Sequence, residues 1–396
     1  MLSLKNRMAE LEQTYIDIRR RLHSNPEIAF QEIDTTALIE EELKSYGITT
    51  FKNGDKTGIV GILRGSGQGK TIALRADIDA LPLKELTGLP YASKNVGKCH
   101  ACGHDIHTAT LLACARLLSE RKDDINGTVK FIFQPAEEGS QGALSVIDNG
   151  FMDDVDAIFG AHVWPELPGG TIGVRRGPMM ASSDIFNIKI NVKGGHAAHP
   201  NKTADSIVIA AYIMLGLQAI VSRELKPTDN AVITIGKMTA GSARNIIPSE
   251  VVLEGTFRCL TPEVRTHISE SIERISVMTA QAHCATAEVK FKANGFPLIN
   301  DDAMNDLVEK AAKIFLGEKN CLNVPLASMG AEDFSYYLQK KPGAFFRLGT
   351  VDDGEEYRLA LHNSKVLFSE KAIAAGALTE CGIVFLYTGS DINKLL

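Results

Sequence analysis

The chain of 396 residues lacks long runs of like charge, low-complexity segments and tandem repeats. Its 48 acidic and 42 basic residues leave a net charge of −6, so nothing indicates a surface for nucleic acid. Hydrophobic residues make up 44% and charged residues 23%, a composition that excludes intrinsic disorder. At roughly 150 residues per domain, the length predicts two or three domains.

The sequence also gives little support for disulfide bonds or for membrane-spanning segments. Seven cysteines, an odd number, do not fit a secreted disulfide framework. The N-terminal sequence is charged and helix-patterned, with no apolar stretch before a small-residue cleavage site. We therefore expect reduced thiols and a cytoplasmic protein that contacts no membrane. Residues 206–222 carry no charge but include polar side chains, which predicts a buried helix and not a membrane span.

The order of apolar patterns predicts an α/β fold interrupted by a second domain. Two helices in the first fifty residues are expected to cover one face of a sheet. Short β-rich runs then alternate with helical stretches, which is typical of α/β proteins. The predicted strands are 58–63, 71–76, 128–133 and 157–161, with a helix at 108–121.

A different texture begins near residue 186, where the runs FNIKINVKGG, AVITIGKMTAG, EVVLEGTFRCL and VKFKANG read as strands. With helices at 206–222 and 262–283, the order becomes β-α-β-β-α-β, which indicates a ferredoxin-like (α+β) unit. We predict that residues 1–185 and 297–396 form one discontinuous domain and that residues 186–296 form an inserted domain.

The segment CHACGHDIH, Cys99 to His107, holds two thiols, three imidazoles and a carboxylate. Three interpretations are open: a C-x-x-C redox pair, a structural zinc site, or an open catalytic metal site. The redox interpretation lacks the expected preceding strand, and the structural zinc site lacks a second closely spaced pair. The catalytic site uses Cys102 and His104 at a helix entrance, and it needs further ligands from elsewhere.

Candidates for those ligands follow the predicted strands, and ligands of α/β sheets collect at the carboxyl ends of strands. One strand runs into Asp77 and Asp79, a second into QPAEEG, and a third into His162, while RLALHNS carries His362. Together they predict a mixed sulfur, nitrogen and oxygen donor set for one or two transition metals. The set is Cys102, His104, Glu138, His162 and His362.

The adjacent pair Glu137 and Glu138 has an energetic consequence, because two neighbouring carboxylates in a dry pocket repel each other. A metal ion explains the pair. One carboxylate binds the cation, and its neighbour takes a proton from activated water and passes it to a leaving nitrogen.

The predicted inserted domain carries three further candidates. His196 and His199 lie in the glycine-flanked run GGHAAHP, where a histidine from a second domain is suited to stabilising an oxyanion. Asn245 in RNIIP and Arg258 on a predicted strand are candidates for binding a substrate carboxylate or carbonyl.

A resemblance accompanies these patterns. The motifs RRxLHxxPE, LRADIDALP, HACGHDxH, QPAEEG, GxHVWP, GGHAAHP, NIIP, GAEDFSYY and LHN run in order from Arg19 to Asn363. They closely resemble the metal-dependent aminoacylase and carboxypeptidase family, in particular its branch of hippurate hydrolases, auxin-conjugate hydrolases and N-acyl-amino-acid amidohydrolases.

The resemblance implies a zinc-exopeptidase-like catalytic domain with an inserted lid domain that commonly pairs two subunits, so a homodimer is expected and a tetramer is open. It implies two divalent ions, of manganese, zinc, cobalt or nickel. Cys102 would bridge them, His104 and His162 would complete one site, and Glu138 and His362 the other. Glu137 would be the general base and acid, and Asp77 would orient a metal-binding imidazole. His196 would reach the scissile carbonyl. Asn245 and Arg258 would bind the far end of the substrate.

The implied activity is hydrolysis of the amide bond of N-acyl-L-amino acids to a carboxylic acid and a free amino acid. A metallo-carboxypeptidase or dipeptidase is the alternative, with a thiol oxidoreductase and a non-catalytic binding protein also open. Cys99 stands where this branch usually has methionine. It is not expected to be a ligand, but a Cys99–Cys102 disulfide would remove the bridging thiolate.

Overall fold

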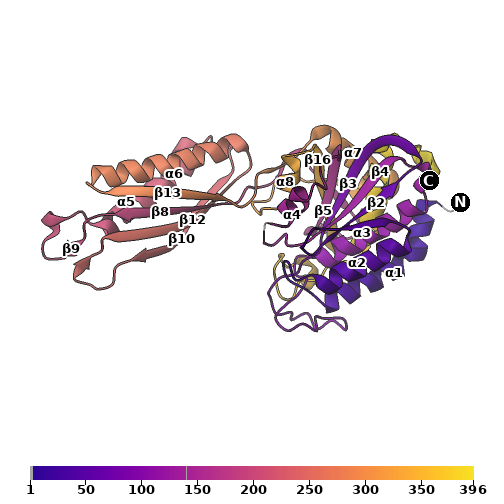
Figure 1. The fold of residues 1–396 in the computed structure, drawn as a ribbon, viewed down its shortest axis with the longest axis horizontal. Coiled ribbons are helices and arrows are strands. Elements are labelled where there is room, and N and C mark those ends of the chain that lie inside the picture. Colours follow the sequence, from indigo (N-terminus) through magenta and orange to yellow (C-terminus); the bar gives the residue numbers. More distant parts are fainter. Residues whose placement is uncertain (1–2, 140) are drawn as a thin grey trace. The chain divides into compact units, whose positions relative to one another are not determined.

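The computed structural model describes residues 3–139 and 141–396, which form two compact units (Figure 1). The first unit comprises Met1–Gly177, Asn300–Pro325 and Tyr336–Leu396, and the second comprises Pro178–Ile299 and Leu326–Ser335. The domain prediction assigned residues 326–335 to the host domain. In the structure this segment packs in the second unit, because the Ala181 amide donates to carbonyls at Ser328 and Gly330, and Arg258 donates to the Met329 carbonyl.

An eight-stranded mixed sheet forms the centre of the first unit, in the order β1-β2-β4-β3-β5-β16-β6-β15. Its four central strands, β4, β3, β5 and β16, run parallel to one another, so their carboxyl ends meet at one edge. The strands are β1 (Thr49–Lys52), β2 (Ile59–Arg64), β3 (Gly67–Asp77), β4 (Asn126–Gln134), β5 (Ala157–Pro168), β6 (Ile172–Val174), β15 (Cys321–Asn323) and β16 (Gly343–Val351).

Helices pack around this sheet, and α3 and α9 contribute much of the hydrophobic core. The helix α2 lies against β1 and β2, whereas α1 packs chiefly on α3 and α9, so only α2 covers the sheet directly as predicted. The helices of this part of the chain are α1 (Leu4–Ser24), α2 (Ile33–Ser45), α3 (His104–Ser119), α4 (Gly142–Asp148), α7 (Asp302–Leu316), α8 (Ser335–Leu338) and α9 (Lys371–Thr388).

The second unit has the predicted β-α-β-β-α-β order. Its four-stranded antiparallel sheet has the order β10-β12-β8-β13, so the first and third strands of the unit are central, as in a ferredoxin-like fold. The elements are β8 (Asp184–Asn191), α5 (Ser206–Ala219), β10 (Ala231–Ala240), β12 (Glu250–Cys259), α6 (Pro262–Ala282) and β13 (Thr286–Ala293). Short pairs join β9 (Gly195–His196) to β11 (Ile246–Ile247), and β7 (Gly177–Met180) to β14 (Leu298–Asn300).

The prediction of a buried helix at residues 206–222 holds for only one face of α5. Two segments have the length and composition of a membrane span, and 33% of Ser206–Glu224 is buried compared with 78% of Lys371–Thr388. Ile209 and Ile213 of α5 lie in the core of the second unit, whereas Tyr212 and Leu215 are exposed. The helix is apolar all round, so its sequence could not show that only one face meets the sheet.

A buried ion cluster fastens α1 to the start of α3. Arg19 Nε lies 2.7 Å from Asp105 Oδ2, and His23 Nδ1 lies 2.8 Å from the same oxygen. Burial opposes ionisation of Asp105, but Arg19 and His23 outweigh it and hold the pKa of Asp105 well below its usual range. The RRxLHxxPE motif therefore anchors the helix on which His104 lies.

We expect Arg19→Met to lower the free energy of unfolding by about 3–5 kcal/mol, because it leaves the Asp105 carboxylate buried without its main partner. Urea unfolding measures this change. The control is the neighbouring Arg20→Met, since the Arg20 side chain is 40% exposed and its ion pair with Glu370 is worth about 1 kcal/mol or less. Equal losses in the two variants would contradict the anchoring role.

Candidate metal centre

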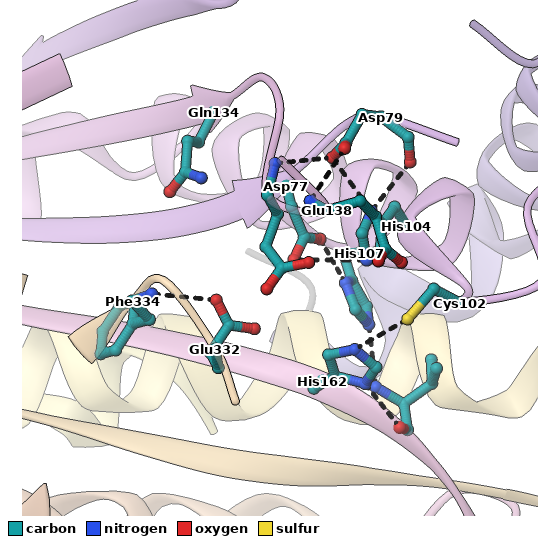
Figure 2. Close-up of polar contacts among 12 residues, drawn as sticks. Asp77, Asp79, Cys102, His104, His107, Gln134, Glu138, His162, Glu332 and Phe334 are labelled. Carbon is teal, nitrogen blue, oxygen red and sulfur yellow. Dashed lines mark hydrogen bonds and ion pairs between the residues drawn. The ribbon is translucent and has the colours of Figure 1, made fainter. Parts of the chain in front are cut away.

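Side chains from four segments of the first unit gather at the carboxyl edge of the parallel strands (Figure 2). Asp77 is the last residue of β3, Glu137 and Glu138 follow β4, and Cys102 and His104 lie at the start of α3. His162 lies within β5 and not after it, because β5 continues to Pro168. The helix α3 begins at His104, earlier than predicted, so the cysteine and histidine occupy a helix entrance.

Cys102 lies at the centre of the cluster. Its Sγ is 3.4 Å from His162 Nε2 and 3.3 Å from His362 Nε2. His362 Nε2 is also 3.2 Å from Glu138 Oε1. The donor atoms form one group of Cys102, His104 and His162 and a second of Cys102, Glu138 and His362, each with atoms within 4.8 Å of one another. The geometry thus brings the five predicted ligands together, and their assignment as ligands stays a prediction.

Hydrogen bonds orient two of the imidazoles as metal ligands require. His162 Nδ1 donates to the Val163 carbonyl at 2.7 Å, and His104 Nδ1 donates to the Asp79 carbonyl at 2.8 Å. Each Nδ1 therefore carries a proton, and loss of any proton on Nε2 leaves that nitrogen's lone pair for a metal. His104 Nε2 is buried and has no hydrogen-bond partner among the described residues. An unsatisfied nitrogen beside a thiol and carboxylates fits a divalent transition metal.

Asp79 connects three segments, although in the sequence it is only a candidate after a predicted strand and is not in the predicted set of site residues. Its Oδ1 accepts the Glu137 amide and its Oδ2 accepts the Glu138 amide, each at 3.1 Å. Its carbonyl accepts His104 Nδ1, and its Oδ1 lies 3.3 Å from the same nitrogen. The pattern LRADID offers two acidic residues, and spacing alone does not distinguish their partners.

Asp77 makes its shortest contact with an imidazole at His107. His107 was not among the site residues predicted from the sequence. His107 Nδ1 donates to Asp77 Oδ1 at 2.5 Å, and His107 Nε2 accepts the Val163 amide at 2.8 Å. Arg75 Nη1 donates to Asp77 Oδ2 at 2.7 Å, and that oxygen is 3.6 Å from His104 Nε2. The predicted orienting role of Asp77 toward a ligand imidazole stays a prediction, while Asp79 makes the shorter contacts with His104.

Three backbone conformations at the site belong to the left-handed region. Gly103, at the N-terminus of α3, has φ of +79°, and a Cβ there would lie 2.5 Å from Val163 Cγ2, so the motif requires glycine. Ala136 and His362 have φ of 53° and 66° without being glycine. Glu32 Oε1 accepts the Ala136 amide, and the Ala101 carbonyl accepts the His362 amide. These contacts hold strained residues beside the donor atoms.

The carboxylates around Cys102 and His104 favour the binding of positive charge at the centre. Burial, together with Glu138, Glu137 and Asp77, raises the pKa of Cys102 well above its usual value. Burial opposes protonation of His104, but Asp77 and Asp79 outweigh it and raise its pKa to about 10. A bound divalent cation would replace these protons, because a metal-bound thiol is deprotonated and a ligand imidazole is neutral.

The redox interpretation of Cys99 and Cys102 gains no support from the structure. Burial raises the pKa of Cys99 to about 11, whereas reactive redox thiols have lowered pKa values. The Cys102 sulfur contacts His162 and His362 instead.

The three predicted residues of the inserted domain lie in the second unit. β9 pairs with β11, and the Asn245 carbonyl accepts the Ala197 amide at 3.1 Å, so His196 and Asn245 lie close together on this ribbon. His196 is exposed, and its Nδ1 accepts the Ala198 amide. Arg258 lies on β12 and donates to the Met329 carbonyl at 3.0 Å. Their roles toward substrate stay predictions.

A profile of peptidase family M20/M25/M40 matches residues 73–384, most of the chain. The chain belongs to this peptidase family. The N-acetyl-L-cysteine deacetylase of Bacillus subtilis is 44% identical over 348 residues, which are 87% of this chain and 82% of the relative. The hippurate hydrolase of Campylobacter jejuni is 37% identical over 378 residues, 95% of this chain and 97% of the relative.

Two solved structures agree with this fold. A dinuclear metal-binding M20 peptidase from Bacillus subtilis has a TM-score of 0.85 and 36% identity, and the match covers 97% of this chain and all of that one. An aminohydrolase from methicillin-resistant Staphylococcus aureus has a TM-score of 0.92 and 35% identity, covering 97% and 99%. The M20 chain is therefore a hydrolase, and the zinc-exopeptidase-like fold with an inserted second domain is confirmed. Its described residues include groups that could hold metal ions.

Metal affinity should increase with pH through the neutral range, because metal must displace protons from His104 and Cys102. Each displaced proton is expected to raise the apparent affinity about tenfold per pH unit below its pKa. Calorimetric titration of the stripped protein with Mn²⁺ or Zn²⁺, in buffers of different ionisation enthalpy, measures the released protons. His283→Gln in the second unit serves as the control, and a pH-independent affinity would contradict the protonated state of His104.

Proposed function

We propose that the protein is a metal-dependent amidohydrolase that cleaves the amide bond of N-acyl-L-amino acids. The observation that carries this proposal is the Cys102 thiol shared by two groups of donor atoms, with the Glu137 and Glu138 pair beside them. Support for the substrate class comes from relatives named for N-acetylcysteine deacetylation, hippurate hydrolysis and hydrolysis of IAA-amino acids.

A carboxypeptidase acting on short peptides is the second candidate. The thermostable carboxypeptidase 2 of Saccharolobus solfataricus is 40% identical over 379 residues, which are 95% of each chain. Both candidates hydrolyse an amide next to a free carboxylate, so the same centre serves either. They differ in whether an acyl group or an amino acid lies on the carbonyl side.

In the proposed mechanism two metal ions would be held by Cys102, His104, Glu138, His162 and His362. Bound there, they would supply a lowered pKa for water and positive charge for the scissile carbonyl. Glu137 accepts the proton of the attacking water and returns it to the leaving amine. Asp79 holds the amides of both glutamates, so the proton carrier and its neighbouring ligand keep a fixed separation.

Residues of the second unit supply the rest of the substrate contacts in this proposal. His196 donates to the developing oxyanion, where a hydrogen bond strengthens as charge grows in the transition state. Asn245 and Arg258 bind the free carboxylate, for which a guanidinium offers two parallel N–H groups. Small N-acyl-amino acids or peptides are the partners, and we place the enzyme in the cytoplasm.

We further propose a homodimer formed through the second unit. The exposed face of α5 supports it, because Ile207, Val208, Tyr212 and Leu215 form an apolar surface of the kind that monomers rarely leave open. Burial of such a face against a second copy would remove it from water.

Metal-loaded protein should release free amine from a panel of N-acetyl, N-benzoyl and N-indolylacetyl L-amino acids, and chelator-treated protein should not.

Glu137→Gln should bind metal normally and lose several orders of magnitude in kcat, because the proton carrier is gone. Glu10→Gln, at a residue on the surface of α1, is the matched control. Faster release from dipeptides than from every acyl-amino acid would favour the carboxypeptidase, and release without metal would exclude both.

Leu215→Glu should shift the protein from dimer to monomer in sedimentation equilibrium while each monomer stays folded, because Leu215 is 71% exposed in the single chain. Val96→Glu, which changes a still more exposed apolar residue of the first unit, should leave the dimer intact. A wild-type protein that stays monomeric at every concentration would contradict the proposed dimer.

A further inference from the structure

Arg347 occupies an unusual position for a cation. It lies on the central strand β16, opposite His162 of β5 and Gly173 of β6. Only 5% of its surface is exposed. Moving a guanidinium from water into such a position is costly unless a carboxylate or several acceptors compensate it.

Among the residues that the structure describes, no hydrogen-bonded carboxylate or set of acceptors compensates Arg347. Its Nε and Nη2 are buried without a hydrogen-bond partner, and Glu166 acts on the guanidinium only as a nearby charge. Its one specific contact is with Trp164, whose ring centre lies 3.7 Å from Cζ. This stacking uses the face of the guanidinium and leaves the N–H groups along its edge unused.

The surroundings favour an anion. Burial lowers the pKa of Arg347 to about 10, with nearby Arg175 acting in the same direction and Glu166 against it. Arg347 nevertheless keeps its charge at neutral pH. Arg175 donates to the carbonyls of Val324 and Pro325, so it adds positive charge at this place without supplying an acceptor. Glu166 is exposed and forms no ion pair with Arg347.

We propose that Arg347 and Trp164 form a binding site for a small carboxylate anion. Nε and Nη2 lie on one edge of the guanidinium, and their two N–H bonds match the two oxygens of a carboxylate in the side-on bidentate arrangement. The indole of Trp164 covers the face and keeps that edge in position. A spherical halide would use the same edge less well, because it cannot accept two parallel N–H bonds at ideal geometry.

This site does not use a metal ion, because a guanidinium is charged and has no lone pair to offer a metal, although Arg347 lies opposite the predicted ligand His162 in the sheet. It does not depend on the proposed amidohydrolase activity. The ligand class nevertheless has a simple relation to that activity, because every amide hydrolysis of this kind yields a carboxylate.

Trp164 is the only tryptophan of the chain, so its fluorescence reports on this site alone. Full-length, metal-loaded protein is titrated with sodium acetate against sodium chloride at constant ionic strength. We expect a saturable change in Trp164 emission with acetate, lost in Arg347→Gln and shifted at least about tenfold to higher concentration in Arg347→Lys, which keeps the charge without the fork. Arg176→Gln, at a half-exposed arginine paired with Asp306, is the matched control and should respond as wild type.

Two further measurements distinguish this site from the metal centre and replace a variant that does not fold. A chelator-treated sample should give the same acetate response, whereas a response that disappears with the metal would place acetate at the metal centre and overturn the proposal. Line broadening of carbon-13 acetate in the wild-type protein, competed by benzoate, replaces the variant data if Arg347→Gln does not fold. No saturable response in the wild type, or an equal response to chloride, would also overturn the proposal.

Discussion

The metal centre depends on one residue, Asp79, that touches three chain segments at once. Its carboxylate accepts the amides of Glu137 and Glu138 after β4, and its carbonyl accepts Nδ1 of His104 at the start of α3. Asp79 itself follows β3, so β3, β4 and α3 are registered against one another by a single side chain and its own backbone. Because the residue is 1% exposed, water does not compete for these contacts.

Charge explains why this arrangement suits a metal. Three carboxylates and a thiol face His104 and His162 where water is largely excluded, and like charges at such distances cannot all be ionised without a cation. The surrounding protein compensates part of this charge, with Arg75 on Asp77 and Arg19 on Asp105. Through these contacts Arg75 holds the end of β3, and Arg19 holds the start of α3. The remaining negative charge is concentrated around Cys102, where a divalent ion neutralises it most effectively.

The chain combines a buried centre on parallel strands with an inserted unit of two layers. The parallel strands are buried on both faces, which fixes the donor atoms. The second unit has one sheet and two helices, so α5 keeps an apolar face that the chain itself does not cover. Arg347 is a further departure from simple packing, since a core position on β16 holds a cation that the fold stacks against Trp164 and does not neutralise. Departures of this kind are where binding sites are expected.

The sequence by itself determined the family, the α/β host with its ferredoxin-like insert, and the types of residue at the centre. Cys102 and His104 are two residues apart, and Glu137 and Glu138 are adjacent, so their chemistry is readable from spacing. Contacts between distant segments were decided only by the tertiary structure. Asp77 and Asp79 look equivalent in LRADID, and only the packing of β3 against α3 and the loop after β4 assigns them different partners. The exposed face of α5 and the unpaired Arg347 could not be predicted from the sequence either. The solvent exposure of a residue and its contacts are set by the whole fold and not by the residues beside it in the chain.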